Sequence, residues 1–457
     1  MQKSSFFTKD KSFYKTLFPM LITVAMQNLI AYSVNMADNI MLGTYSQQAL
    51  SGAAIVNQIF FMVQQFAMSV ANTLVAMAAQ YWGQNRPKPI RTLTGTALRL
   101  GISVGVILVA LCLIIPEPIL RIFTSEASII AQGKTYLAIV SWSFLLFIAT
   151  QILMAALRAV QTVKISFWVS LVSLLVNVII NYVLIFGKFG MPEMGIAGAA
   201  VGTVVARFVE LVIVLIYLVK TDKKLCLFAH RDILTPDKML TKDYRKVYLP
   251  IMCSSVLWGV SVPMQTAILG HLSDNAIAAN AVATTFYQYL KVIIVAMSST
   301  SAVIIGTSIG KGDMERIKSD ARTLACIDVL IGLVLGAALV LLRGSLLSLY
   351  DLDSEAMRMA ANLIAIMGLI MVGMSYQMPV SFGIIQGAGD GKFTMRMNMI
   401  STWCIVMPLS FAAAFWWKLP VEWVVLVIQS DQIFKGLPTF IHFRKYNWMK
   451  KLTRTAE

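Results

Sequence analysis

Residues 82–85 read Trp82-Gly83-Gln84-Asn85 at the end of a long apolar stretch, and residues 309–312 read Ile309-Gly310-Lys311-Gly312 at the end of another. The central glycines of these two segments are 227 residues apart, and the same offset carries Gly43 onto Gly270. Landmarks that keep one spacing at the ends of apolar stretches predict that the chain contains the same structural unit twice.

The composition predicts that both units lie in a membrane. Hydrophobic residues make up 58% of the chain and charged residues 13%, and a spanning helix needs about 20 apolar residues. The sequence accommodates twelve such spans, six in each half, near 16–42, 51–80, 92–115, 129–156, 166–187, 195–219, 247–270, 278–308, 323–342, 357–385, 395–416 and 420–441. We therefore predict an all-α polytopic membrane protein with two six-helix pseudo-symmetric lobes.

Four segments follow from this division. They are an amino-terminal lobe at 1–220, a cytoplasmic linker at 221–246, a carboxy-terminal lobe at 247–441 and a basic cytoplasmic tail at 442–457. Duplicated membrane halves that pack around a central site are the build of secondary transporters. No nucleotide-binding, metalloprotease or serine-hydrolase motif stands in a suitable context, so we expect a transporter and not an enzyme.

The net charge of +16 follows the membrane topology. Lys and Arg gather before the first predicted span, after the second, in the linker and in the tail, whereas the connections 43–50 and 271–277 carry neither. This alternation is the positive-inside pattern. We expect a multi-pass protein of a cell membrane, specifically a bacterial inner membrane, with both termini in the cytoplasm. The positive charge then reflects the orientation of the chain in the membrane, and we expect no nucleic-acid-binding surface.

The cysteines predict neither a disulfide nor a metal centre. There are five of them, at 112, 226, 253, 326 and 404, without the paired spacing of a metal site. Most fall inside predicted spans, where a free cysteine behaves as a small hydrophobe. We expect no cofactor and no metal beyond a possible Na⁺.

Asp38 is the leading candidate for function. It follows an almost uncharged stretch from Phe18 to Ala37, and a charged side chain at the centre of a membrane helix costs roughly 2.5–3.5 kcal/mol. One reading is an interfacial carboxylate near a helix end. The other is a carboxylate in a half-buried cavity that binds a proton or a metal cation, as a cation-coupled transporter requires.

Polar residues of two later spans could complete such a site. Asn177 and Asn181 are four residues apart and share one face of the fifth predicted span, where their amide oxygens suit a small cation. Helix–helix hydrogen bonding is the alternative role. Thr203 lies on a span rich in small residues, and its hydroxyl is either a ligand or a packing group.

The remaining embedded charges admit plainer explanations. Arg207 and Glu210 are three residues apart and can pair with each other. Arg99 and Asp328 lie within about two turns of the predicted cytoplasmic span ends, where snorkelling would solvate them. Lys291 lies deeper, and it either pairs across the lobes or lines a cavity.

Several segments together resemble the multidrug and toxic compound extrusion (MATE) transporters. They are Asp38-Asn39-Ile40-Met41-Leu42-Gly43, Ala49-Leu50-Ser51-Gly52-Ala53, Asn177 to Gly187, Gly195-Ile196-Ala197-Gly198-Ala199-Ala200, Ala156-Leu157-Arg158-Ala159 and Gln386-Gly387-Ala388-Gly389-Asp390. The resemblance extends over about residues 13–440. It implies two six-helix lobes and the exchange of drugs for Na⁺ or H⁺.

The resemblance also implies an amino-terminal cation-coupling site made of Asp38, Asn177, Asn181 and Thr203. Asn181 stands where some members of the family carry a second carboxylate, which leaves one formal charge in this set. Proton and sodium therefore both remain possible coupling ions.

The carboxy-terminal half departs from the family pattern. Many members carry acids near the positions of Trp258 and Ser375, and the repeat mate of Asp38 is Gln265. None of these three side chains is acidic, so we expect the coupling ion to act on the amino-terminal lobe alone.

We therefore predict a cation-coupled efflux antiporter for organic, cationic or amphipathic compounds, which works by alternating access as a monomer in the lipid bilayer. The predicted lining of the substrate cavity is Asn35, Gln58, Trp258, Gln265, Tyr287, Lys291 and Met374. One alternative is a lipid-linked oligosaccharide flippase, which would need several cationic residues in its cavity. The other is a channel-like membrane protein, for which no filter-like segment is found.

Overall fold

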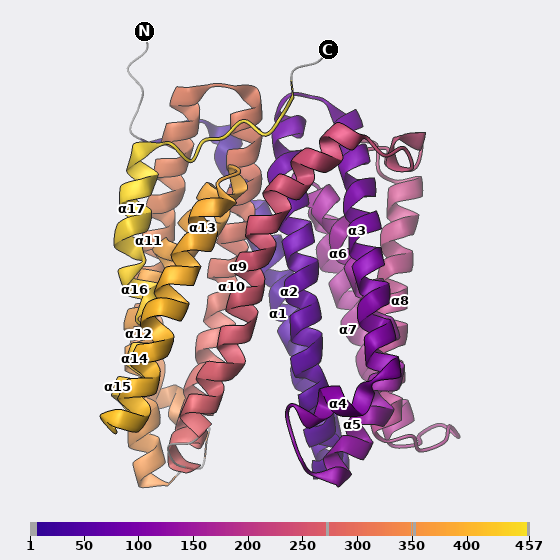
Figure 1. Cartoon of the computed structure of the whole chain (residues 1–457), viewed down its shortest axis with the longest axis vertical. Helices are drawn as coiled ribbons and strands as arrows, with labels where there is room; N and C mark the ends of the chain where they lie inside the picture. Colours follow the sequence, from indigo (N-terminus) through magenta and orange to yellow (C-terminus); the bar gives the residue numbers. More distant parts are fainter. Residues whose placement is uncertain (1–6, 271–273, 349, 351–352, 455–457) are drawn as a thin grey trace. The chain divides into compact units, whose positions relative to one another are not determined.

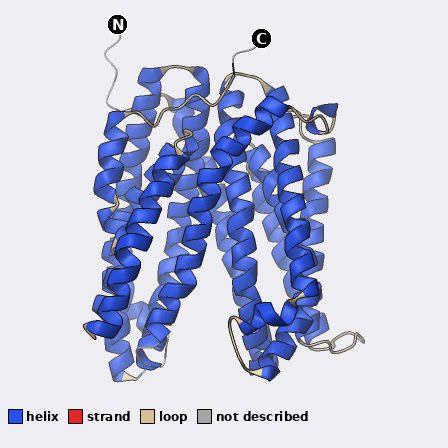
Figure 2. Ribbon diagram, viewed as in Figure 1, coloured by secondary structure: helices blue, strands red, loops and turns tan. Residues whose placement is uncertain are grey.

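The computed structural model describes residues 7–270, 274–348, 350 and 353–454, and this part of the chain is built from helices without a strand (Figures 1 and 2). Among the described residues, 11 helices or helix runs are long and apolar enough to cross a membrane. The predicted fold class, an all-α polytopic membrane protein, is confirmed.

The first half of the chain forms eight α-helices. They are α1 (Lys11–Tyr45), α2 (Gln47–Gly83), α3 (Pro87–Ile114), α4 (Pro116–Arg121), α5 (Ala127–Val140), α6 (Trp142–Ala159), α7 (Lys164–Ile185) and α8 (Ile196–Lys220). The α1 and α2 helices have 35 and 37 residues, well above the roughly 20 that a membrane span needs.

The second half begins after a short 3-10 helix, η1 (Arg231–Ile233). Its α-helices are α9 (Lys238–Gly270), α10 (Asp274–Lys311), α11 (Met314–Leu347), α12 (Ser354–Met378), α13 (Gly391–Asn398), α14 (Met407–Phe411), α15 (Val421–Gln429), α16 (Asp431–Phe434) and α17 (Gly436–Lys445). Three π-helical segments interrupt the last spans, namely η2 (Pro379–Ile385), η3 (Met399–Val406) and η4 (Ala412–Trp416).

Two predicted spans are broken helices. The span predicted at 129–156 consists of α5 and α6, which meet at Ser141, and the span predicted at 420–441 consists of α15, α16 and α17. The last three helices are each shorter than a membrane span, which explains why 11 spans are found by length where twelve were predicted. At each break the regular helical hydrogen-bond ladder is interrupted.

The described residues pack into two compact units. The amino-terminal unit comprises Met26–Ala78 and Asn85–Tyr248, and the carboxy-terminal unit comprises the residues up to Ala25, Ala79–Gln84 and the residues from Leu249 onward. The two predicted lobes, 1–220 and 247–441, are each a continuous part of the chain and are separated by the linker 221–246. The compact units differ from them because the beginning of α1 and the end of α2 pack with the second half.

Apolar packing accounts for the position of the beginning of α1. Phe13 and Leu17 are buried in one hydrophobic cluster with Ile304 and Ile305 of α10 and Val380 of η2. Burying a large apolar side chain contributes about 1.5–3 kcal/mol. These contacts hold the first turns of α1 in the carboxy-terminal unit.

A close helix crossing accounts for the position of the end of α2. A Cβ atom on Gly83 would overlap the Thr307 carbonyl oxygen, and a Cβ atom on Gly310 would overlap that of Gln80. Each added Cβ would also lie 3.0 Å from the Cα atom of the other glycine. Because these two glycines are repeat mates, the contact between α2 and α10 is reciprocal, and only glycine permits it.

Candidate cation-coupling site

Asp38 of α1 meets the two asparagines of α7 within the amino-terminal unit. Asn181 Nδ2 donates hydrogen bonds to Asp38 Oδ1 at 2.5 Å and to Asn177 Oδ1 at 3.3 Å. The i, i+4 spacing therefore places both amides on one helical face, as predicted. Asn177 and Asn181 are 1% and 0% exposed, whereas Asp38 is half-buried.

Small residues of α8 allow this packing. A Cβ atom on Gly202 would overlap Asn181 Oδ1, and one on Gly198 would lie 2.7 Å from the backbone carbon of Leu184. The α7 and α8 helices therefore approach each other closely, and they run side by side in Figure 1. The small residues of α8 leave room for the face of α7 that carries Asn177 and Asn181, and Asn181 on this face contacts Asp38.

The side-chain amides of Asn177 and Asn181 each retain one atom that forms no hydrogen bond to the described part of the protein. Within the described residues, Asn177 Nδ2 and Asn181 Oδ1 are buried without a hydrogen-bond partner. Which atom of an asparagine amide is oxygen and which is nitrogen is assigned from its hydrogen bonds. A half-turn of the Asn181 amide would therefore direct its oxygen toward Asp38, which only a protonated or cation-bound carboxylate would tolerate.

Thr203 lies beside this group without bonding to Asp38. Its hydroxyl donates to the Ala199 carbonyl oxygen of its own helix at 3.1 Å. Tyr136 of α5, which is 4% exposed, interacts with the Thr203 hydroxyl and with the charge of Asp38. Tyr136 was not predicted as a site residue, because nothing in the sequence distinguishes it from other polar-tipped side chains of its span.

Arg207 is a second neighbour of Asp38 that was not predicted from the sequence. It forms the predicted ion pair with Glu210 at 2.8 Å, and its guanidinium lies 5.1 Å from the centroid of the Phe147 ring. Its positive charge also acts on Asp38. The i+4 spacing from Thr203 was the signal that could have revealed it.

The predicted cavity residues of the carboxy-terminal unit fall into two groups. Tyr287 and Met374 are buried together, with the Tyr287 hydroxyl 2.9 Å from the Met374 sulfur. Lys291 Nζ lies 5.5 Å from the centroid of the Trp258 ring, and both side chains are half-buried. Gln265 of α9 is also half-buried.

Asn35 and Gln58, the predicted cavity residues of the amino-terminal unit, are exposed on α1 and α2. The structure brings neither of them into the hydrogen-bonded group around Asp38. The lining role of all seven residues stays a prediction.

The carboxy-terminal unit contains a buried ion pair that was not predicted from the sequence. Lys435 Nζ lies 2.7 Å from Asp431 Oδ2, and the two residues are 2% and 5% exposed. Lys435 also donates to Asn398 Oδ1 at 3.0 Å. The i, i+4 spacing of an acid and a base inside a predicted span could have revealed this pair.

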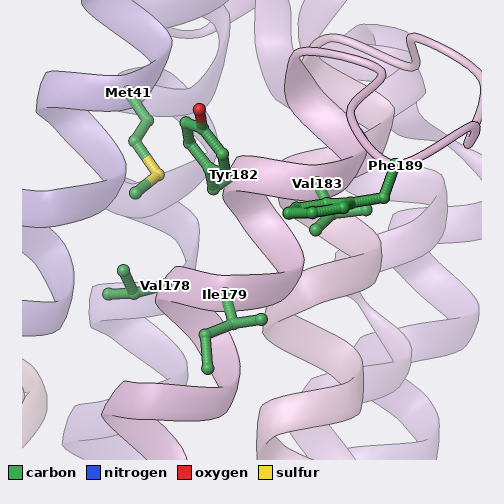
Figure 3. A pocket seen from close by; sticks show the side chains of 6 residues that line it. All are labelled: Met41, Val178, Ile179, Tyr182, Val183 and Phe189. Atoms are coloured by element: carbon green, nitrogen blue, oxygen red, sulfur yellow. The ribbon is translucent and has the colours of Figure 1, made fainter.

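An apolar groove is lined in part by α1 and α7, the helices that carry Asp38 and the site asparagines. It has a volume of about 380 Å³ and is lined by Met41 of α1, by Val178, Ile179, Tyr182 and Val183 of α7, and by Phe189 (Figure 3). Val178 and Tyr182 each follow one of the site asparagines in the chain. Its six lining residues include no charged side chain and none of the residues hydrogen-bonded around Asp38.

The sequence profile of the MatE family matches residues 23–183 and 250–412, which together make up more than half of the chain. The chain belongs to the MatE family. The two matched segments begin 227 residues apart, the same offset that separates the repeated glycines. The resemblance inferred from the sequence is confirmed, and this MatE protein is a multi-pass membrane transporter and not an enzyme.

Curated relatives of this MatE protein match nearly its whole length. A "Probable multidrug resistance protein NorM" of Thermotoga maritima is 25% identical over 447 residues, which cover 97% of this chain and 95% of the relative. The protein of the same description from Rhizobium meliloti is 27% identical over 399 residues, which cover 85% of this chain and 84% of the relative.

Solved MATE structures share the fold. The crystal structure of MATE in complex with MaL6 superposes with a TM-score of 0.85 at 16% identity and covers 94% of this chain and 95% of that chain. The outward-facing conformation of a multidrug resistance MATE family transporter of the MOP superfamily gives 0.85 at 16% identity and covers 96% and 98%. At this identity the likeness shows the fold alone.

Proposed function

We propose that this MatE protein is a cation-coupled antiporter that exports organic compounds, cationic or amphipathic, from the cytoplasm by alternating access. The observation that carries the proposal is the hydrogen bond from Asn181 to Asp38, which sets a carboxylate beside buried amides inside apolar helices. Relatives described as probable multidrug resistance proteins support the export of organic compounds.

The residues around Asp38 suit either coupling ion. A small hard cation such as Na⁺ prefers oxygen ligands, which the Asp38 carboxylate, the Asn177 and Asn181 amides and the Thr203 hydroxyl would supply. A proton would instead turn the Asp38 carboxylate into a hydrogen-bond donor. In both cases the negative charge is neutralised.

Neutralisation can drive a conformational change only if the two occupancies of Asp38 prefer different states. The negative form accepts the hydrogen bond from Asn181 and is attracted to Arg207. The neutral form loses this attraction. We infer that cation binding from outside favours release of the substrate and that cation release inward resets the transporter.

The proposal includes a place in the cell. The alternation of Lys and Arg between successive connections supports cytoplasmic termini, and the bacterial relatives support a bacterial inner membrane. The transporter is proposed to work as a monomer, because each predicted part of the coupling site comes from one chain.

The experiment uses proteoliposomes loaded with a fluorescent organic cation, on which Na⁺ and pH gradients are imposed separately. Wild type should transport the organic cation uphill when one of the two gradients is imposed, and that gradient identifies the coupling ion. Asp38→Asn should abolish this transport. Glu126→Gln, a change at an exposed acid of the same unit, is the matched control and should transport normally.

Full gradient-driven transport by Asp38→Asn would remove Asp38 from the mechanism. Downhill flux that neither gradient can reverse would support a channel-like protein. Absence of transport in wild type would direct the next assay to flipping of lipid-linked oligosaccharides.

A further inference from the structure

The buried acid of the carboxy-terminal unit already has its partners. Asp431 Oδ2 accepts from Lys435 at 2.7 Å and from the Thr402 hydroxyl at 3.4 Å, and Asp431 Oδ1 accepts from Gln432 at 2.9 Å. Lys435 in turn donates to Asn398. One carboxylate and one ammonium group are therefore balanced within this network.

Lys291 adds a second positive charge near the same carboxylate. Asp431 acts on Lys291 electrostatically, but within the part of the chain that the structure describes no ion pair includes Lys291. With Lys291 protonated, the three ionisable side chains Lys291, Asp431 and Lys435 carry one net positive charge. A charge without a partner is costly inside a membrane protein, and an anion beside Lys291 would neutralise it.

The surroundings of Lys291 indicate what kind of anion fits. The Trp258 ring centroid lies 5.5 Å from Lys291 Nζ, within the range of a cation–π contact. An aromatic ring packs favourably against another aromatic group, while the ammonium group forms charge-assisted hydrogen bonds with a carboxylate. Both side chains are half-buried, so part of each remains open to contact by a ligand.

We propose that Lys291 and Trp258 form a subsite for the carboxylate of an aromatic organic acid. The proposal rests on the proposed export of organic compounds, and it specifies one amphipathic class among them, molecules that combine an aromatic ring with a carboxylate. The ammonium group binds the carboxylate, and the indole ring packs against the aromatic part. Asp431 stays with Lys435 and repels the anion from that side.

A matched pair of ligands tests the subsite. Radiolabelled 1-naphthoate and 1-naphthamide have the same ring and differ in charge, and their affinities for the full chain in nanodiscs are measured by equilibrium dialysis against empty nanodiscs. Wild type should bind the carboxylate at least about tenfold more tightly than the amide, the effect of one hydrogen bond to a charged group. Lys291→Met should remove this preference and leave the affinity for the amide unchanged.

Two further variants make the result specific. Lys291→Arg keeps the positive charge and should retain most of the preference. Lys392→Met removes an exposed lysine of the same unit and should retain all of it. Unchanged binding of the amide shows that each variant is folded.

Equal affinities of wild type for the two ligands, or a preference that survives Lys291→Met, would overturn the subsite. Transport of the organic cation on the same preparations separates this result from the proposed function. Gradient-driven transport without a carboxylate preference would leave the antiporter intact and reject the subsite. A carboxylate preference without gradient-driven transport would retain the subsite and reject the antiporter.

Discussion

At the scale of single residues, Arg207 links the candidate coupling site to a buried ion pair. It lies one helical turn after Thr203, forms an ion pair with Glu210 at 2.8 Å and acts on Asp38 through its charge. The side chains of Arg207 and Glu210 are 18% and 7% exposed. Breaking such a pair leaves a buried charge without compensation.

Arg207→Gln should therefore destabilise the protein by about 3 kcal/mol, because Glu210 would remain buried and charged. The double change Arg207→Gln with Glu210→Gln should recover most of this loss. Thermal unfolding in detergent, followed through intrinsic tryptophan fluorescence, measures both. A double variant as unstable as the single one would contradict the ion-pair explanation.

Asp328 contradicts its predicted role as a snorkelling carboxylate. It is 1% exposed, and within the described residues neither carboxylate oxygen has a hydrogen-bond partner. It follows Met314, the first residue of α11, by about four turns, a distance that its short side chain does not bridge. The predicted span begins at residue 323, whereas the helix begins nine residues earlier, at Met314.

Asp328→Leu should stabilise the protein by about 1–3 kcal/mol, because the change removes an unsatisfied buried polar group at similar volume. The midpoint of thermal unfolding should therefore rise. The matched control is Asp320→Leu, which removes a buried acid that accepts hydrogen bonds from Thr8 and Ser308 and should lower the midpoint. A lowered midpoint for Asp328→Leu would reveal an interaction that compensates its burial.

At the scale of helices, the crossing of α2 and α10 requires glycine at positions 83 and 310, although glycine has a low helix propensity. Gly310→Ala should destabilise the protein by about 1–3 kcal/mol through overpacking, because its Cβ atom would overlap the Gln80 carbonyl oxygen. Gly344→Ala in α11 meets open space and should raise stability by up to about 1 kcal/mol through helix propensity. Equal effects of the two changes on the unfolding midpoint would contradict the crossing.

The tail after α17 is held by the end of α2. Gln80 Nε2 donates to the Lys450 carbonyl oxygen at 3.0 Å, and the Leu452 amide donates to Gln80 Oε1 at 2.8 Å. Gln80→Leu should speed hydrogen exchange of the Leu452 amide by at least about tenfold, because local opening would no longer break these bonds. Exchange read by mass spectrometry on a peptide of residues 449–454 tests this, and unchanged protection would mean that other contacts hold the tail.

At the scale of the whole molecule, the twelve predicted spans, the internal repeat and the charge pattern together predict an orientation in the membrane. Lys188 precedes α8 and Lys223 follows it, and both are exposed. In a background with all five cysteines replaced, Lys188→Cys should react with an impermeant maleimide outside intact cells, and Lys223→Cys should react only after lysis. The opposite result would reverse the proposed topology.

The fold class and the repeat could be read from the sequence because each depends on local composition. Apolar stretches of spanning length need no partner to be recognised, and the offset of 227 residues also separates the two segments that match the MatE profile. The shared face of Asn177 and Asn181 could be read for the same reason, since it follows from helical periodicity.

Only the tertiary structure decided which side chains meet across helices. The rotation and depth of each helix bring Tyr136 and Arg207 close to Asp38. They also bury Asp328 without a hydrogen-bond partner among the described residues and pair Asp431 with Lys435. Such contacts join residues far apart in the chain and depend on close approaches such as that of Gly202 to Asn181. Hydrophobic periodicity determines that a helix crosses the membrane, whereas packing determines which neighbour each polar side chain has.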